Sequence, residues 1–248
     1  MTHGHQPSRS RAYVATATAL AALTLGGTAL TQTTASAAGG GTRGHDVSSY
    51  QRAVDWQQAR NKGARFVYVK ATESTNYRNP FFGAQYNGAR NAGIIRGAYH
   101  FAVPNKSSGQ AQAAYFVKNG GGWRADGWTL PPAVDLEYNP YGKQKCYGLS
   151  QGRMVSWVRA FSDEVRRRTG RRPVIYTSYH WWKVCTGDSR ALAGNHALWL
   201  ARYDDRAGML PAGWAYWTFW QYGNSGGLPG DQNLFNGSQA QLRSFARG

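Results

Sequence analysis

The sequence predicts an α/β fold, an irregular (β/α) barrel with fewer than eight helices. The chain has 248 residues, 42% of them hydrophobic and 14% aromatic, which suits one domain with a substantial core. Short β-rich runs alternate with polar or amphipathic stretches, the pattern of βαβ units. Beyond Tyr176 the strand-like runs continue with little helix between them, so part of the helical layer is expected to be missing.

The expected elements follow one another as pairs of a strand and a helix. The pairs are residues 44–47 and 54–62, 66–69 and 80–91, 94–103 and 110–118, and 133–137 and 150–168, followed by a strand at 174–176. Three more strands are expected at 197–201, at 217–222 and within 230–235. No internal repeat or proline-rich linker interrupts this part, so we predict one domain over residues 43–248.

The start of the chain has the composition of an export signal. It is basic and free of acids, continues with small and apolar residues up to Leu30, and ends in the cleavage pattern Ala35-Ser36-Ala37. We predict a signal peptide over residues 1–37 and a glycine-rich linker over 38–42, and therefore a secreted protein. A first helix of the domain is the alternative. No apolar run reaches the roughly 20 residues that a membrane-spanning helix needs.

Two cysteines, Cys146 and Cys185, lie in the domain. Since an exported protein meets an oxidising environment, we predict one disulfide that closes a loop of about 40 residues, worth roughly 3–4 kcal/mol in the chain-entropy model. Two unpaired thiols are the alternative. A zinc site would need paired cysteine spacing, which is absent.

The charge balance is strongly basic, with 29 Lys and Arg against 12 Asp and Glu, a net charge of +17. Such a field attracts polyanions, which include nucleic acid, anionic lipid and acidic cell-wall polymers. Any carboxylate chemistry must come from only nine Asp and three Glu residues. The search for catalytic acids is therefore short.

Several familiar site types leave no motif in the sequence. There is no His-Glu-x-x-His or Gly-x-x-x-x-Gly-Lys-Ser/Thr pattern, which argues against zincin and P-loop chemistry. The histidines are scattered, and we interpret each as a core or rim residue: His45, His100, His180 and His196. We assign no metal and no cofactor.

The most informative motif is Asp135-x-Glu137 in an otherwise apolar strand after Pro131-Pro132. Residues at i and i+2 of a strand project on the same face, so both acids point one way while Val134 and Leu136 point the other. Two close carboxylates cannot both ionise cheaply, so one keeps a proton and can act as an acid. Cleavage of a glycosidic bond uses one protonated and one ionised carboxyl group in this way. Two solvated acids on an edge strand are the alternative.

Asp46 and Asp231 are the other acids that could join the pair. Asp46 lies on the first expected strand and Asp231 on the last. A parallel barrel would bring Asp46 to the same mouth, where catalysis is built. Alone, Asp46 could be a helix N-cap and Asp231 a turn residue after Pro-Gly.

Aromatic residues gather near the ends of the expected strands. Flat rings stack on sugar rings while nearby polar groups bind the hydroxyls, which suits a carbohydrate groove. Individually, such residues are more often part of the core. The set is Tyr99, Phe101, Tyr138, Tyr176, Trp199, Tyr203, Trp220 and Tyr222.

From about Arg43 to Gly248 the chain closely resembles glycoside hydrolase family 25, the Chalaropsis-type lysozymes or 1,4-β-N-acetylmuramidases, especially secreted bacterial ones. The resemblance rests on eight ordered motifs: GHDVSSYQ at 44–51, FVYVKATE at 66–73, GAYHF at 97–101, DxE at 135–137, IYTS at 175–178, LWLARY at 198–203, WQY at 220–222 and DxNxF at 231–235. It implies the irregular barrel of that family.

The resemblance also implies an activity and residue roles. The activity is hydrolysis of the β-1,4 bond between N-acetylmuramic acid and N-acetylglucosamine in peptidoglycan. Glu137 matches the general acid/base, Asp135 its partner at the 2-acetamido group or the positive charge, and Asp46 and Asp231 the outer acids. The expected substrate-binding residues are Tyr99, Phe101, Tyr138, Tyr176, Trp199, Tyr203 and Gln221.

Three other functions stay open at this point. A chitinase-like hydrolase would use the same acid pair, and a wall-binding protein could keep the groove without catalysis. A nucleic-acid binder would rest on charge alone, since no binding motif accompanies the cluster at Arg166–Arg172. We expect a monomer that acts on peptidoglycan and binds anionic cell-wall polymers, without nucleic acid.

Overall fold

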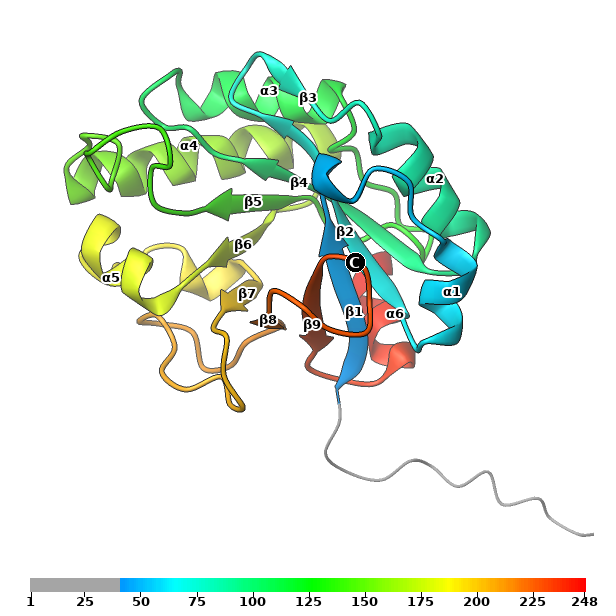
Figure 1. The fold of residues 1–248 in the computed structure, drawn as a ribbon. Coiled ribbons are helices and arrows are strands. Elements are labelled where there is room, and N and C mark those ends of the chain that lie inside the picture. Colours follow the sequence, from blue (N-terminus) through cyan, green and yellow to red (C-terminus); the bar gives the residue numbers. More distant parts are fainter. Residues whose placement is uncertain (1–40) are drawn as a thin grey trace, which may run out of the picture. The chain divides into compact units, whose positions relative to one another are not determined.

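Eight strands close into a barrel in the computed structural model, which describes residues 41–248 (Figure 1). The strands follow the order β1-β9-β8-β7-β6-β5-β4-β2, and pairing of β1 with β2 closes the ring. A short ninth strand, β3, pairs only with β2. The predicted signal peptide, residues 1–37, and most of the predicted linker lie outside the described residues.

Seven of the eight barrel strands run parallel, and β9 runs antiparallel to both of its neighbours. The carboxyl ends of the parallel strands therefore meet at one mouth, to which β9 contributes its first residue. The strands are β1 (Thr42–Val47), β2 (Phe66–Glu73), β3 (Tyr77–Arg78), β4 (Ile95–Phe101), β5 (Ala133–Leu136), β6 (Val174–Thr177), β7 (Leu198–Ala201), β8 (Phe219–Gly223) and β9 (Asp231–Phe235).

Six α-helices accompany the strands in residues 41–248, which confirms the prediction of fewer than eight. No helix lies between β7 and β8 or between β8 and β9, so the helical layer is incomplete there, as expected. The helices are α1 (Trp56–Asn61), α2 (Phe82–Asn91), α3 (Gly109–Lys118), α4 (Gln151–Thr169), α5 (Tyr179–Thr186) and α6 (Gln239–Arg247), with short 3₁₀ turns at Ser49–Gln51 and Ala193–Asn195.

The sequence patterns missed α5 and α6. Helix α5 has a clear start, because the Ser178 hydroxyl accepts a hydrogen bond from the Trp181 amide at 3.1 Å, and it ends at Gly187 with a φ of 68°. Its aromatic residues are weak helix formers, however. The helix is stabilised by the burial of Trp181 and Trp182 against the core below α4, which no local pattern reveals.

Side chains on the barrel strands alternate between two apolar layers. Val134 and Leu136 point outward and pack with α3 and α4, whereas Ala133 belongs to the inner layer, as the strand period predicts. Large aromatic residues fill the inside of the barrel, and Trp199 stacks on Tyr68 with a centroid distance of 4.7 Å. This packing forms a solid floor below the mouth.

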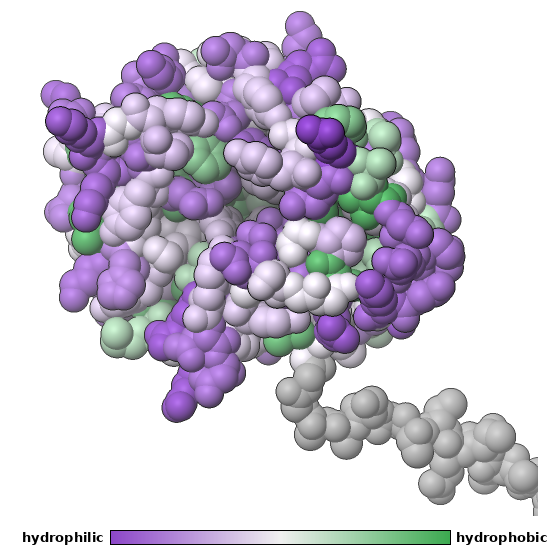
Figure 2. Space-filling model, viewed as in Figure 1, coloured by the Kyte–Doolittle hydropathy of each residue, from purple (hydrophilic) through white to green (hydrophobic). Residues whose placement is uncertain are grey.

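The outer surface is mostly polar. Figure 2 shows hydrophilic residues over most of the face seen in Figure 1, with hydrophobic residues in small separate patches. No helix among residues 41–248 has the length and apolar character needed to cross a membrane.

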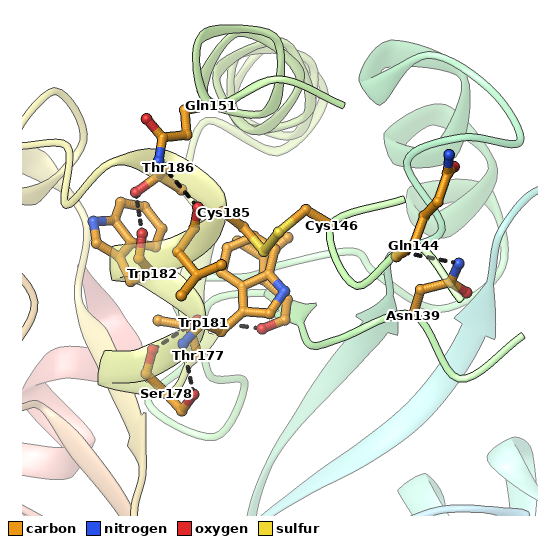
Figure 3. The surroundings of a disulfide bond; sticks show 12 residues. Asn139, Gln144, Cys146, Gln151, Thr177, Ser178, Trp181, Trp182, Cys185 and Thr186 are labelled. Carbon is orange, nitrogen blue, oxygen red and sulfur yellow. Dashed lines mark hydrogen bonds between the residues drawn. A yellow bond between two sulfur atoms is a disulfide. The ribbon is translucent and has the colours of Figure 1, made fainter. Parts of the chain in front are cut away.

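The predicted disulfide is present between Cys146 and Cys185. It joins the segment after β5 to helix α5, and Trp181 lies beside it (Figure 3). The loop that follows the acid pair is therefore tied to the helical layer.

Replacing both cysteines by alanine should lower the free energy of unfolding by about 4 kcal/mol. The sequence separation is 39 residues, and the unfolded chain regains the corresponding loop entropy. Equilibrium unfolding in urea, with the disulfide of the unsubstituted protein kept oxidised, measures the difference. A change below about 1 kcal/mol would show that the cross-link does not constrain the unfolded chain.

Candidate active site

Four acids meet at the mouth of the barrel. Asp46 stands near the end of β1, Asp135 near the end of β5, Glu137 just beyond it, and Asp231 begins β9. Asp46 and Asp231 are direct cross-strand partners, because β9 enters the ring antiparallel to β1. Together they line a cavity of about 200 Å³ with Tyr99, Tyr176, Trp199, Tyr203 and Gln221.

Amide side chains hold the two outer acids. The Gln221 amide donates to Asp46 Oδ2 at 2.9 Å and to Asp231 Oδ2 at 3.2 Å, while the Tyr176 hydroxyl donates to Gln221 Oε1 at 2.7 Å. Asn233 Nδ2 donates to Asp46 Oδ2 at 2.7 Å. Both ends of the Gln221 amide are thus engaged by protein groups, so this residue orients acids in the structure.

Asn233 was not singled out by the sequence as a site residue. Its side-chain oxygen accepts a hydrogen bond from Trp199 Nε1 at 2.7 Å, which aims its amide nitrogen at Asp46. Its place in the Asp231-x-Asn233 motif was the available signal, because residues at i and i+2 share a strand face.

Burial governs the charge of Asp46. The residue is 8% exposed, and desolvation, with repulsion from Asp231, raises its pKa to about 8. The amide donors of Gln221 and Asn233 act in the opposite direction without cancelling this effect. Asp46 therefore holds a proton over much of the acidic and neutral pH range.

Asp135 and Glu137 form a coupled pair. Asp135 is 5% exposed and its Oδ1 atom is buried without a hydrogen-bond partner, whereas Glu137 lies at the exposed rim. Desolvation raises the pKa of both, and repulsion from Glu137 raises that of Asp135 further. Both groups therefore hold a proton more tightly than a free carboxyl group does, and ionisation of one opposes ionisation of the other.

Lys70 on β2 is the nearby cation, and its charge lowers the pKa of both members of the pair. Its ammonium contacts Glu73 at 2.7 Å and lies 4.7 Å from the centre of the Phe101 ring. Glu73 also accepts a hydrogen bond from the Tyr141 hydroxyl. The sequence missed this group, although Lys70 and Glu73 belong to its FVYVKATE motif.

Five of the seven residues expected to bind substrate line the cavity, and Phe101 and Tyr138 do not. Phe101 packs below Lys70, and Tyr138 stands at the rim beside Glu137 with Lys145 over its ring. Tyr203, which lies after β7, is 54% exposed and presents its ring to solvent at the cavity. Trp220 and Tyr222 do not line the cavity.

Three of the histidines serve the core. Burial lowers the pKa of His45, His100 and His196 to about 4, so they remain neutral. His45 Nδ1, for example, contacts the Pro229 carbonyl oxygen at 2.6 Å. Within residues 41–248, no group of three His, Cys, Asp or Glu side chains is arranged to hold a metal ion.

Two adjacent carboxyl groups at the mouth of an aromatic-lined (β/α) barrel are an arrangement typical of glycoside hydrolases. The chain belongs to the glycosyl hydrolases family 25, whose sequence model matches residues 45–231. This confirms the predicted family, and the enzyme is of the lysozyme type.

Known members of the family are similar over almost their whole length. The N,O-diacetylmuramidase of Arthroderma benhamiae is 49% identical over 84% of this chain and 88% of that protein. The N,O-diacetylmuramidase of Chalaropsis sp is 47% identical over 83% of this chain and 99% of that protein. The solved family GH25 lysozyme from Aspergillus fumigatus is 45% identical, covers 84% of this chain and 99% of its own, and superposes with a TM-score of 0.82. The predicted irregular barrel is thereby confirmed.

The stability of Asp46→Asn relative to the wild type should rise as pH increases from about 4 to 8. The folded pKa of Asp46 is about 8, above the unfolded value of 3.8, so in this window the folded state binds the extra proton and loses stability as the proton leaves. Urea unfolding at pH 5, 6 and 7 measures the slope. Asp205→Asn, the same change at an exposed position, should follow the wild type. Parallel profiles for Asp46→Asn and wild type would contradict the assignment.

Proposed function

We propose that the protein is a secreted, monomeric N-acetylmuramidase that cleaves the β-1,4 bond between N-acetylmuramic acid and N-acetylglucosamine in bacterial peptidoglycan. The observation that carries the proposal is the Asp135 and Glu137 pair, two carboxyl groups of raised pKa that line the same acidic cavity. The names of the relatives, N,O-diacetylmuramidase and lysozyme, support the same bond and substrate.

Glu137 is proposed as the general acid and base. Glu137 is an exposed residue that lines the cavity, where the oxygen of a glycosidic bond can approach its carboxyl group, whereas Asp135 is buried. A proton passes from Glu137 to the leaving oxygen as the bond to the anomeric carbon breaks. Glu137 then takes a proton from the water that attacks this carbon, which restores the starting state.

Asp135 is proposed to bind the 2-acetamido group of the sugar. Asp135 lines the cavity, so its carboxylate can accept a hydrogen bond from the acetamido N–H of a bound sugar. Such a bond favours the ionised form of Asp135 and leaves a proton on Glu137, where the reaction needs it. The ionised Asp135 then stabilises the positive charge that develops at the sugar, directly or through the acetamido oxygen.

Asp46 and Asp231 are proposed to orient the substrate and to tune the Asp135 and Glu137 pair. They face the pair across the cavity, and the amide of Gln221 bridges them. Fixed dipoles and acids around a developing cation lower its energy most where water is scarce. Trp199, Tyr203 and the tyrosines beside them supply ring faces for the sugar.

Glu137→Gln should lower the release of reducing ends from purified peptidoglycan by a factor of about 10² to 10⁴, because glutamine cannot donate the proton. Borohydride reduction of the wild-type products should yield reduced muramic acid. Glu164→Gln, the same substitution on helix α4 far from the mouth, is the matched control and should retain activity.

Three outcomes would redirect the proposal. Reduced glucosamine ends would show cleavage of the other glycosidic bond. Rapid hydrolysis of soluble chitin oligomers, with none of peptidoglycan, would favour the chitinase-like alternative. A folded wild-type protein that binds the wall without releasing reducing ends would be a catalytically silent binder.

Export is the remaining part of the proposal. Expression with the full leader in a secreting bacterial host should place the mature protein in the medium, with Ala38 as its first residue. Amino-terminal sequencing and the intact mass of the secreted protein test this. Retention in the cells with residues 1–37 attached would contradict the predicted signal peptide.

A further inference from the structure

The two ends of the barrel carry opposite charge. The cavity at the mouth is lined by four acids and by no lysine or arginine. A larger hollow, about 920 Å³ in volume, is lined by three arginines and by no acid. We call it the basic hollow, and its charged residues are Arg166, Arg171 and Arg172.

The basic hollow lies at the end of the barrel opposite to the mouth. It is lined by residues that precede or begin β5, β6, β7 and β8, including Pro131, Val174, Ala197 and Thr218. Since Pro131 and Glu137 stand six residues apart across β5, the two sites are separated by about 20 Å. A ligand in the basic hollow therefore leaves the catalytic mouth free.

Arg172 is held in place by a buried relay. Its Nη1 atom donates to Ser162 Oγ at 3.0 Å, and Ser162 Oγ in turn contacts His196 Nε2 at 2.6 Å. His196 Nδ1 contacts the Leu192 carbonyl oxygen at 2.7 Å. A carbonyl only accepts, so Nδ1 carries the hydrogen and Ser162 donates to Nε2. The relay is satisfied throughout and fixes the guanidinium at the edge of the hollow.

The other two arginines carry charge that no carboxylate neutralises within residues 41–248. Neither Arg166 nor Arg171 forms an ion pair there, whereas Arg172 contacts the exposed Asp163 at 2.9 Å. Arg171 donates to the Phe245 carbonyl oxygen at 3.3 Å and lies over the Trp123 ring. Its position is thus set by the protein while its charge stays available.

Aromatic side chains from the segment between β7 and β8 face these arginines. Trp214, Tyr216 and Trp217 line the hollow, and the Tyr216 ring is 66% exposed. The segment is anchored, because Trp214 Nε1 donates to the His196 carbonyl oxygen at 2.8 Å and the Asn236 side chain donates to the Trp217 carbonyl oxygen at 3.0 Å. Rings and guanidinium groups are therefore presented together on a preformed wall.

We propose that the basic hollow binds an anionic cell-wall polymer made of sugar or polyol units joined by phosphodiesters. The inference rests on the proposed function, since it supplies the enzyme with a second hold on the wall. Guanidinium groups bind phosphate oxygens with paired, charge-assisted hydrogen bonds, and the exposed ring offers a face for the sugar or polyol unit.

Charge complementarity selects this end of the molecule for the polymer. The cavity at the mouth is lined by acids and by no cation that could bind a polyanion, while the glycan strand that enters it is uncharged at the bond to be cleaved. The phosphodiester keeps one negative charge per unit at any working pH, so successive units can meet more than one of the three arginines.

The test compares charge reversal inside and outside the basic hollow. Arg166→Glu and Arg153→Glu change the same helix by the same charge, and the two positions lie about 20 Å apart along α4. Each substitution is made in the Glu137→Gln variant, because this variant should not cleave the glycan strands during the binding measurement. Sedimentation with purified walls at 0.15 M salt gives the dissociation constants, for walls that carry phosphodiester polymers and for walls stripped of them by hydrofluoric acid.

Arg166→Glu should raise the dissociation constant for polymer-bearing walls about tenfold, and Arg153→Glu about twofold or less. On stripped walls, Glu137→Gln and its two derivatives with Arg166→Glu or Arg153→Glu should bind equally well, and each more weakly than Glu137→Gln binds polymer-bearing walls. Tyr216→Ala, which leaves the charge unchanged, should weaken binding only to polymer-bearing walls. Thermal unfolding checks that the variants are folded.

Equal losses in Arg166→Glu and Arg153→Glu would overturn the proposal, because net charge alone would then hold the wall. A loss in Arg166→Glu that persists on stripped walls would also overturn it, since peptidoglycan itself would be the ligand. The activity of the wild type on stripped peptidoglycan is measured separately. If the wild type has no such activity, the muramidase proposal is refuted. The binding measurements would still show whether the basic hollow binds the polymer.

Discussion

Repulsion among carboxylates in one small, poorly solvated cavity is the constraint on which the rest of the site depends. Ionising all of them together would be costly, so the site needs means to reduce their charge. The pKa values of Asp135 and Glu137 are raised, the amides of Gln221 and Asn233 bind the outer acids, and Lys70 stands nearby. Burial and the same repulsion favour the protonated form of these groups, which is the property that the proposed acid catalysis uses.

The acids, the amides and the lysine of the site come from different strands, so they meet only in a closed barrel. The reversed direction of β9 is essential, because it brings the first residue of that strand, Asp231, to the mouth beside Asp46. A parallel strand would bring its first residue to the opposite end. The aromatic floor has a similar role, since Trp199 both packs on Tyr68 inside the barrel and directs Asn233 towards Asp46.

The distribution of charge gives the molecule two distinct ends. Only 12 acids oppose 29 basic residues, yet four of these acids surround the reaction centre. The excess basic residues therefore lie elsewhere on the molecule. At the far end of the barrel, three arginines line the basic hollow, and buried polar groups hold Arg172 in place. One small domain can thus combine a groove for a glycan strand with a separate surface for a polyanion.

The sequence by itself determined what depends on local order. The period of two along residues 133–137 placed Asp135 and Glu137 on one face, and alternating strands and helices indicated the barrel. The tertiary structure alone decided the rest, because it depends on contacts between distant segments. Helix α5 has a weak helix propensity and is stabilised by its buried tryptophans. Asp46 and Asp231, 185 positions apart in the sequence, become neighbours because β9 runs antiparallel to β1. Arg171 and Arg172, just after α4, line one hollow with the segment between β7 and β8, more than 40 residues later. Local sequence patterns do not predict such pairings, since only closure of the barrel brings these side chains together.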